Sequence, residues 1–314
     1  MKNEKTNPES AGNVRTQFNE SKGKEAYRVA FTLLSDYCIG MTGGMTNIWV
    51  AYWNNHEFRS HITDAIIELN ANKKEIIESV KSACKVLLPD NVDMDTEVNI
   101  HIIADGNRGY FQFGNNVMMD IIYFDDFSEF LYTLKHEMHH AYYRKWFAEK
   151  TSNKERNEGE DYLYQCQESF IFEGIAQRLD FDATYSNEHK QMFANKELIT
   201  ELFDEWITLF RALKGDSPQT VIEMYQENEY ERAIERGKKY YPGKNETHHI
   251  RPDIQYFLSY NIYNSIFEAA GQEKLKYVIE NPDKLLLIYN ELHIDSMIVP
   301  RIPDDIVRIW QESF

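Results

Sequence analysis

The sequence predicts an α+β protein that is predominantly α-helical. Long stretches place apolar residues at helical spacing, whereas only three short segments have the β-branched, alternating character of strands. The composition, 42% hydrophobic and 27% charged, is that of a globular chain with a sizeable core. These observations predict one small sheet, which we expect to be antiparallel, in a largely helical chain.

The 314 residues show a change of composition near the N-terminus. Residues 1–25 are rich in Asn, Lys, Glu, Ser and Gly, and we expect them to form a disordered tail. Residues 26–314 contain no internal repeat and are predicted to form a single unit. Its parts are a helical N-terminal part at 26–95, a central part at 96–185 and a helical C-terminal part at 186–314.

The central part is predicted to hold the sheet and two helices. The strand candidates are Val98–Ile103, Tyr110–Phe113 and Val117–Phe124. A helix is then expected from Asp125 to about Glu149, with Asp125, Asp126 or Ser128 as its N-cap. After a polar stretch from Thr151 to Glu160, a second helix is expected from Asp161 to Asp182.

The net charge of the chain limits the classes of partner that we expect it to bind. The formal net charge is −17, which repels phosphate backbones and anionic lipid surfaces, so we expect neither nucleic acid nor a membrane as a partner. No stretch is long and apolar enough to span a bilayer, and no signal peptide is visible. Three cysteines, Cys38, Cys84 and Cys166, do not suggest a disulfide framework. We therefore expect a soluble, cytoplasmic protein, and no pattern indicates an oligomeric state.

The segment that carries chemistry is His136-Glu137-Met138-His139-His140, an HExxH motif on a predicted helix. Residues four apart on a helix share one face, so His136 and His140 can direct two imidazoles at one metal ion. Two neutral ring nitrogens suit zinc. Glu137 flanks this pair, where it can take a proton from the attacking water and return it to a leaving amine.

The alternative for the two histidines is a hydrogen-bonded pair on a core face. A helical wheel disfavours it, because His136, His140 and Thr133 lie opposite the apolar stripe. That stripe contains Phe127, Phe130, Leu131, Leu134, Met138, Ala141 and Tyr142. His139 points to a different side, so we interpret it as a surface or supporting group rather than a ligand.

Zinc in a catalytic site needs a third protein ligand, and the next predicted helix offers Glu173. Glu173 lies off the apolar stripe of that helix, whereas the rival Glu168 projects into the stripe. The neighbours Gly174 and Ala176 are small, which lets two helices approach closely. The sequence therefore predicts one zinc ion per chain, held by His136, His140 and Glu173.

HExxH followed on the next helix by Glu173-Gly-Ile-Ala176 resembles the gluzincin group of zinc peptidases. The pattern is especially similar to uncharacterised bacterial zinc proteases with an HExHH and EG(I/L)A pair. The resemblance implies a thermolysin-like zincin core with His136, His140 and Glu173 as metal ligands and Glu137 as catalytic base. The chain departs from the usual pattern at Gln177, where gluzincins often carry an acid, although Asp180 could replace that acid.

The resemblance also implies a Tyr or His from the C-terminal half that stabilises the oxyanion. The candidates are His248, His249, Tyr256 and Tyr260. We favour His249 and Tyr256, which precede a later helix that also echoes the family. The substrate, a peptide or protein, is expected to lie extended beside the Val117–Phe124 strand.

Two other functions stay open. A different zinc hydrolase, such as an amidase or deformylase, would keep HExxH, but deformylases add a cysteine ligand and no cysteine here lies in a recognisable ligand motif. A metal-binding or interaction protein without catalytic activity would keep the fold but would not turn over a substrate. The intact Glu137 favours an enzyme, a zinc metallopeptidase.

Overall fold

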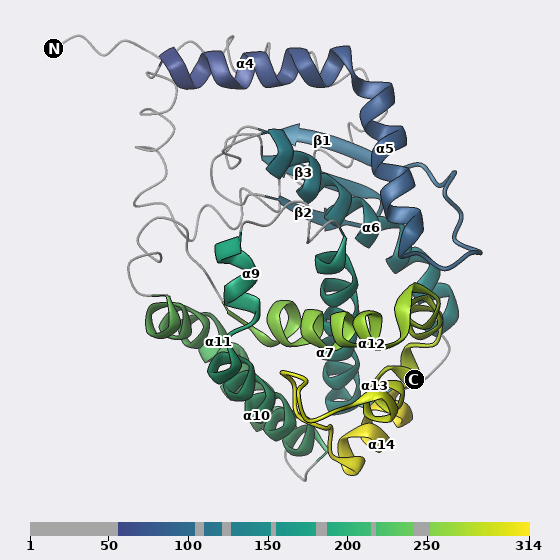
Figure 1. Ribbon diagram of the computed structural model, residues 1–314, viewed down its shortest axis with the longest axis vertical. Coiled ribbons are helices and arrows are strands. Elements are labelled where there is room, and N and C mark those ends of the chain that lie inside the picture. Colours follow the sequence, from purple (N-terminus) through teal and green to yellow (C-terminus); the bar gives the residue numbers. More distant parts are fainter. Residues whose placement is uncertain are drawn as a thin grey trace, which may run out of the picture. The chain divides into compact units, whose positions relative to one another are not determined.

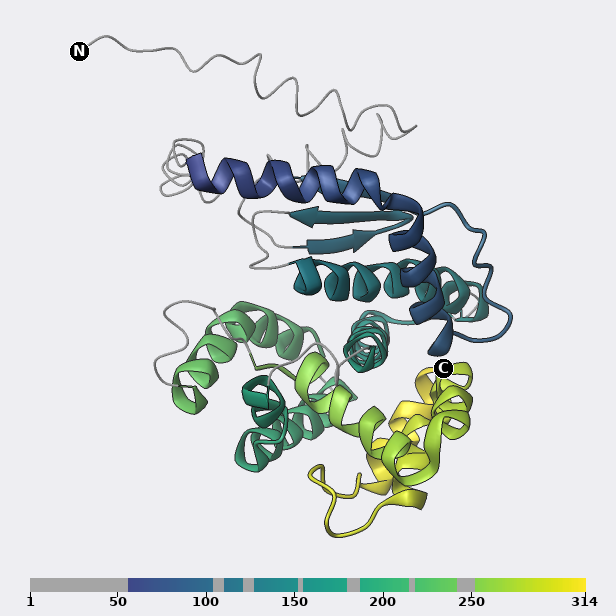
Figure 2. The same cartoon turned by 45° about the horizontal axis from the view of Figure 1, so that its top comes forward.

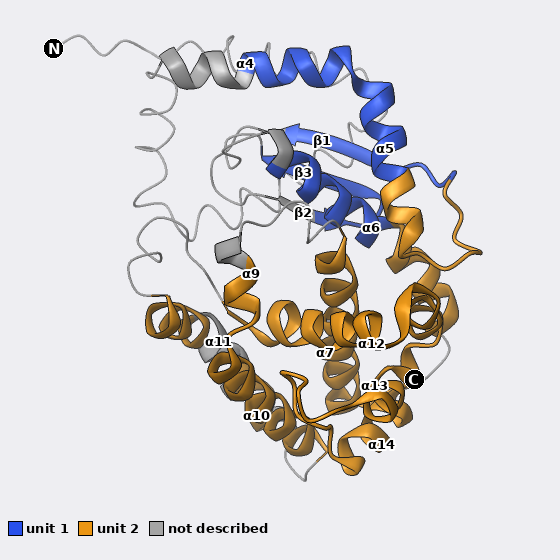
Figure 3. Ribbon diagram, in the orientation of Figure 1, with its two compact units in different colours: residues 1–81, 95–141 blue, residues 82–94, 142–314 orange. Residues whose placement is uncertain are grey.

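The computed structural model describes residues 56–103, 110–120, 127–151, 155–179, 187–214, 218–241 and 252–314. The expected tail at 1–25 and His249 lie outside these residues. The chain forms two compact units, one of residues 1–81 and 95–141 and the other of residues 82–94 and 142–314 (Figure 3). None of the helices in the described ranges is both long enough and apolar enough to cross a membrane.

The first unit combines two helices, a small sheet and the first part of a third helix. The elements are α4 (His56–Ala71), most of α5 (Lys73–Val86), β1 (Asn99–Ile103), β2 (Tyr110–Phe113), β3 (Asn116–Asp120) and α6 (Phe127–Thr151) as far as Ala141. Figure 2 shows the strands beside the N-terminal part of α6. The described part of the chain is thus mostly helical with one small sheet, as the sequence predicts.

The sheet is mixed, so the expectation of an antiparallel sheet is wrong for one of its two pairings. Its strand order is β1-β3-β2. β2 and β3 form an antiparallel hairpin around Gly114, whose φ of 57° lies in the left-handed region that glycine tolerates. β1 pairs with β3 in parallel. The last strand, β3, thus lies between the two strands that precede it in the chain, which local turn signals do not reveal.

β3 is the central strand and not an edge. Each of its sides is hydrogen-bonded to a neighbour, and Val117, Met118, Met119 and Asp120 are all buried. A continuous buried run is typical of a strand covered on both faces. Along its described residues from Asn116 to Met119, β3 therefore has no free edge to receive a peptide, which corrects the expected position of the substrate there.

The two helices of the central part form where the sequence predicts them, with one shifted start. α7 spans Glu158–Arg178 and begins earlier than expected, because Asn157 and Glu160 form a capping box. The Asn157 side chain accepts from the Glu160 backbone N–H at 3.0 Å, and the Glu160 carboxylate accepts from the Asn157 N–H at 3.2 Å. An N-cap residue followed three positions later by Glu is a recognisable start signal.

The second unit is helical, and α7 lies at its centre. The other elements are α9 (Asn187–Phe193), α10 (Lys196–Leu213), α11 (Pro218–Tyr240), the π-helix η2 (Ile254–Leu258), α12 (Ser259–Glu280), the 3-10 helix η3 (Pro282–Lys284), α13 (Leu285–Leu292) and α14 (Asp304–Ser313). α7 packs against α10, α11, η2, α12 and α14. Figure 1 shows α12 crossing α7.

An aromatic cluster joins α7 to its neighbours in the second unit. Phe170 of α7 stacks on Trp206 of α10, with ring centroids 5.1 Å apart, and meets Trp310 of α14 edge to face at 5.7 Å. Phe210 stacks on Trp310 at 6.2 Å. All four side chains are almost fully buried. Large aromatic surfaces removed from water hold α7 firmly in place.

Gly174 allows the close contact between α7 and α12. A Cβ atom at this position would stand 2.7 Å from Cδ2 of Tyr263 and 2.8 Å from Cβ and Oγ of Ser259. Real Cβ atoms do not approach other heavy atoms so closely, so any side chain here would push the two helices apart. The small residue that the sequence places after Glu173 therefore has a packing role.

We predict that Gly174→Ala lowers the free energy of unfolding by about 1–3 kcal/mol, because it overpacks the α7–α12 contact. Alanine in place of glycine inside an open helix would instead stabilise the protein by roughly 1 kcal/mol. The sign of the change in the free energy of unfolding, measured by urea unfolding, therefore distinguishes overpacking from the higher helix propensity of alanine. The double variant Gly174→Ala/Ser259→Gly removes part of the clash and should recover part of the loss. A more stable Gly174→Ala protein would contradict the contact.

Candidate metal centre

His136 and His140 face each other one turn apart on α6. Their Nε2 atoms are 3.0 Å apart, and their ring centroids are 4.5 Å apart with the rings nearly perpendicular. Each side chain is only 4% exposed. The i, i+4 spacing on one helix face produces this convergence directly, as the sequence predicts.

Glu173 of α7 brings a carboxylate to the same place. One ligand atom from each of His136, His140 and Glu173 lies within 4.8 Å of the other two. Glu173 is half-buried, whereas the two histidines are buried. In the part of the chain that the structure describes, these residues form the one group of three or more His, Cys, Asp or Glu side chains that could hold a metal ion.

The donor set fits zinc. Two nitrogens bound tetrahedrally at roughly 2.0–2.1 Å from zinc would stand about 3.3 Å apart, close to the observed 3.0 Å. Two imidazoles and one carboxylate are also the ligands of several catalytic zinc sites, where a fourth position stays open. The types of residue present and the closeness of their donor atoms therefore fit a zinc ion.

The central part of α6 is buried on most of its sides, whereas the helical wheel predicts an amphipathic helix with one polar face. From Tyr132 to Tyr143 nearly every side chain is buried, including Thr133, Glu137 and both histidines of the pair. The absence of His136 and His140 from an apolar stripe is therefore a weak argument against a core pair. The interpretation of the pair as part of a metal site therefore rests on the third donor residue, Glu173, whose carboxylate lies close to both histidines.

Glu137 and His139 are also buried in this helix. Glu137 is 5% exposed and His139 is fully buried. The surface interpretation of His139 is therefore wrong, which leaves a supporting role, and His139 is not part of the group of donors. A carboxylate such as that of Glu137 costs free energy to bury unless charges or hydrogen bonds compensate it. A divalent cation beside Glu137 would supply such compensation.

The rival ligand Glu168 is not part of the donor group. Burial raises the pKa of its carboxyl, and the nearby guanidinium of Arg144 partly opposes this shift. Glu168 lies five residues before Glu173 on α7, more than a full turn away along the helix. The structure therefore favours Glu173 over Glu168, as the sequence analysis does.

The structure describes only some of the remaining candidate site residues. Gln177 is buried one turn after Glu173, and Asp180 and His248 lie outside the described residues together with His249. Tyr256 lies in η2, where its backbone N–H donates to the Asp253 carboxylate at 3.0 Å. Tyr260 is buried in α12. The packing of η2 on α7 was not predicted, because π-helices carry no simple sequence signal.

Comparison with known proteins agrees with this geometry. Residues 9–295 match the model of a protein family described as "Putative zinc dependent peptidase (DUF5700)". The chain belongs to this family. The match includes every residue of the candidate centre, and the description of the family names the same metal that the donor set fits. No curated protein and no solved structure matches the chain.

We predict that Glu173→Ala weakens zinc binding by about 100-fold or more, because it removes one of three protein donors. The matched variant Glu168→Ala, on the same helix, should change the affinity by less than about threefold. Zinc affinity is measured by competition with a chromogenic chelator, and circular dichroism checks that both variants fold. If Glu168→Ala proved the more damaging change, the third ligand would be wrongly assigned.

Proposed function

We propose that the protein is a zinc-dependent peptidase that hydrolyses peptide bonds, with His136, His140 and Glu173 holding one zinc ion and Glu137 as general base and acid. The observation that carries this proposal is the convergence of two imidazoles and a carboxylate within 4.8 Å, with Glu137 next to the first ligand in the chain. The family description supports the same chemistry.

Zinc in such a site acts as a Lewis acid that polarises a carbonyl and lowers the pKa of water. The protein supplies the remaining parts of the mechanism. The buried histidine pair excludes bulk water from one side, which strengthens the electrostatic interactions in the site. Glu137 accepts the proton of the attacking water and transfers it to the departing amine, so that the leaving group departs neutral.

We propose a zincin-type core in which an extended substrate adds to the sheet at β2. β2 is an edge strand of the described sheet, since it is paired only with β3 there. β2 is also antiparallel to β3, and its outer backbone N–H and C=O groups can form a ladder with a peptide. On β2, the side chain of Gln112 is half-buried and that of Phe113 is exposed.

Tyr256 remains our proposal for the oxyanion donor. Its side chain is only half-buried, and it stands in η2, which packs on the helix that carries Glu173. A phenol group that approaches from this side could donate a hydrogen bond to the tetrahedral intermediate. Tyr260, by contrast, is buried in the core of the second unit and is the weaker candidate.

A deformylase-like ligand set is not favoured by the geometry. Deformylase-type sites combine HExxH with a cysteine, but the donor group contains a carboxylate and no cysteine. Cys84 is fully buried in α5, and Cys166 stands two turns before Glu173 on α7. The donor set therefore resembles that of peptidases with two histidines and one glutamate.

We predict that Glu137→Gln keeps about one zinc ion per chain but lowers kcat for a quenched fluorescent peptide by about 10²–10⁴-fold. The amide keeps the shape of the side chain and removes only its capacity to accept a proton. Metal content is measured by atomic spectroscopy on the same sample. Chelation of the wild-type protein should abolish cleavage, and added zinc should restore it.

Two results would contradict the proposed function. Cleavage by Glu137→Gln at the wild-type rate would remove Glu137 from the chemistry. A zinc-loaded wild-type protein that cleaves no member of a broad peptide library would instead indicate a metal-binding protein without turnover.

A further inference from the structure

Arg144 lies on the helix that carries the two histidines of the candidate metal centre, one turn after His140. His136, His140 and Arg144 stand at positions i, i+4 and i+8 of α6, so they share one face of this continuous helix. The rise along the axis from His140 to Arg144 is about 6 Å, and side chains on a helix lean back toward its N-terminus. Arg144 therefore belongs to the immediate surroundings of the candidate centre.

A contact with α7 holds the guanidinium next to the third donor residue. Cζ of Arg144 lies over the ring of Phe172, 5.0 Å from the ring centroid, and Phe172 directly precedes Glu173. The Phe172 ring is almost fully buried, whereas Arg144 is the first exposed residue after the buried stretch of α6. The aromatic face attracts the guanidinium and covers one side of it, while the other side is accessible from the solvent.

The hydrogen-bond donors of Arg144 are not used within the described part of the chain. No described residue forms an ion pair or a hydrogen bond with its guanidinium, and an aromatic ring takes up none of its five N–H groups in a conventional hydrogen bond. The guanidinium lowers the pKa of the Glu168 carboxyl against the larger effect of burial, but these two described side chains form no ion pair. The planar group can therefore bind a carboxylate from outside through two parallel hydrogen bonds.

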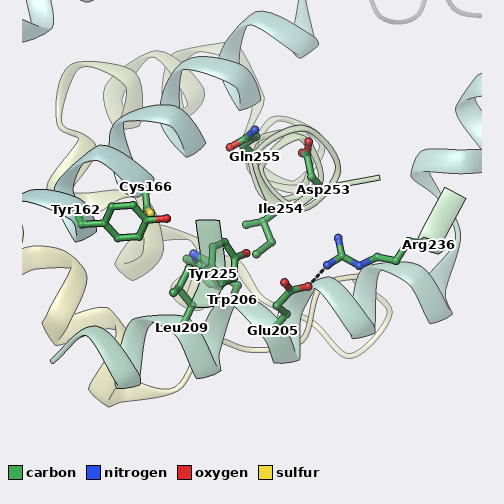
Figure 4. A pocket seen from close by; sticks show the side chains of 10 residues that line it. All are labelled: Tyr162, Cys166, Glu205, Trp206, Leu209, Tyr225, Arg236, Asp253, Ile254 and Gln255. Carbon is green, nitrogen blue, oxygen red and sulfur yellow. Dashed lines mark hydrogen bonds and ion pairs between the residues drawn. The ribbon is translucent and has the colours of Figure 1, made fainter. Parts of the chain in front are cut away.

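Other arginines of the second unit are paired with carboxylates. The chain contains 51 acidic residues and 34 Lys and Arg residues, so acidic partners are abundant. Described arginines that form such an ion pair are Arg211, Arg232, Arg236, Arg301 and Arg308. Figure 4 shows one of these pairs, between Arg236 and Glu205, beside a small cavity of this unit. In a chain with this excess of acid, an arginine left unpaired beside a metal centre indicates a partner that comes from outside the chain.

We propose that Arg144 binds a carboxylate of the peptide substrate, one or two residues from the bond that is cleaved. The proposal rests on the proposed peptidase function and names a feature of its substrate. The rise of about 6 Å between His140 and Arg144 equals the length of about two residues of an extended peptide, which sets this position.

Two groups of a peptide carry this chemistry: the C-terminal carboxylate, and the side chain of an aspartate or glutamate. The net charge of −17 repels a strongly anionic substrate at a distance. A single carboxylate held at one place, rather than an acidic peptide, is therefore the ligand that fits this chain.

The first test compares N-acetylated peptides that differ by one carboxylate. One arm compares a free C-terminus with its amide, and the other compares Glu with Gln at each position of a peptide with an amidated C-terminus. Cleavage is followed through the new amino groups by their reaction with fluorescamine. We expect the carboxylate to raise kcat/KM about tenfold in one arm, equivalent to about 1.4 kcal/mol, mainly through a lower KM. The arm that responds identifies the carboxylate, and equal rates for every pair in both arms would overturn the proposal.

Arg144→Gln tests whether Arg144 causes this preference. The ratio of kcat/KM for the carboxylate peptide and its amide should fall toward one, and Arg144→Lys, which keeps the charge but not the paired donors, should keep part of it. Lys145→Gln is the matched control, because it removes the same charge from the neighbouring exposed residue of α6 and should leave the ratio unchanged. A loss of packing alone would slow both peptides equally. An unchanged ratio in Arg144→Gln would contradict the role of Arg144.

A binding test makes the two proposals separable. Each pair of peptides is titrated into zinc-loaded Glu137→Gln protein, and dissociation constants are measured by isothermal calorimetry. One carboxylate peptide should bind about tenfold more tightly than its amide, and the double variant Glu137→Gln/Arg144→Gln should bind both equally. Carboxylate-dependent binding without any cleavage by the wild type would contradict only the peptidase function. Cleavage that is indifferent to the carboxylate would contradict only the role of Arg144.

Discussion

The close approach of α7 and α12 at Gly174 is the constraint on which the candidate centre depends. A zinc–oxygen bond tolerates only a few tenths of an ångström, so the backbone that carries Glu173 must be held firmly. Gly174 follows Glu173 directly, and its lack of a side chain lets Ser259 and Tyr263 lie against the backbone. The aromatic cluster around Phe170 and Trp206 holds the same helix one turn earlier. Packing in the second unit thus fixes the third donor.

Several ionisable residues of α6 and β3 are buried. Asp120 and His139 are fully buried, and Glu137 is nearly so. Ionisable groups so far from water are costly unless opposite charges and hydrogen bonds compensate them. A divalent ion held by His136 and His140 would supply positive charge in this region. The burial that makes the helix unusual is therefore consistent with a metal-dependent role.

The sequence predicts local features well and non-local ones poorly. The His136–His140 pair follows from helical spacing alone, and Glu173 follows from its position off the apolar stripe of the next helix. The central position of β3 and its parallel pairing with β1 depend on where the chain returns, which no local signal encodes. The burial of His139 depends on what packs around α6 from several directions. The earlier start of α7 is encoded by the capping box of Asn157 and Glu160, which lies within a stretch whose polar character favours a loop.

The π-helix η2 packs against α7, the helix that carries Glu173. A π-turn widens the backbone at Ile254–Leu258, and such turns are frequent at functional sites. Arg236 donates to the carbonyl of Pro252, two residues before η2, and the Ser169 hydroxyl of α7 donates to Gln255 within η2. The same short segment carries Tyr256, whose backbone N–H donates to the Asp253 carboxylate. A change in η2 is therefore expected to disturb two features together: the packing of α7, which carries Glu173, and the position of Tyr256, the proposed oxyanion donor.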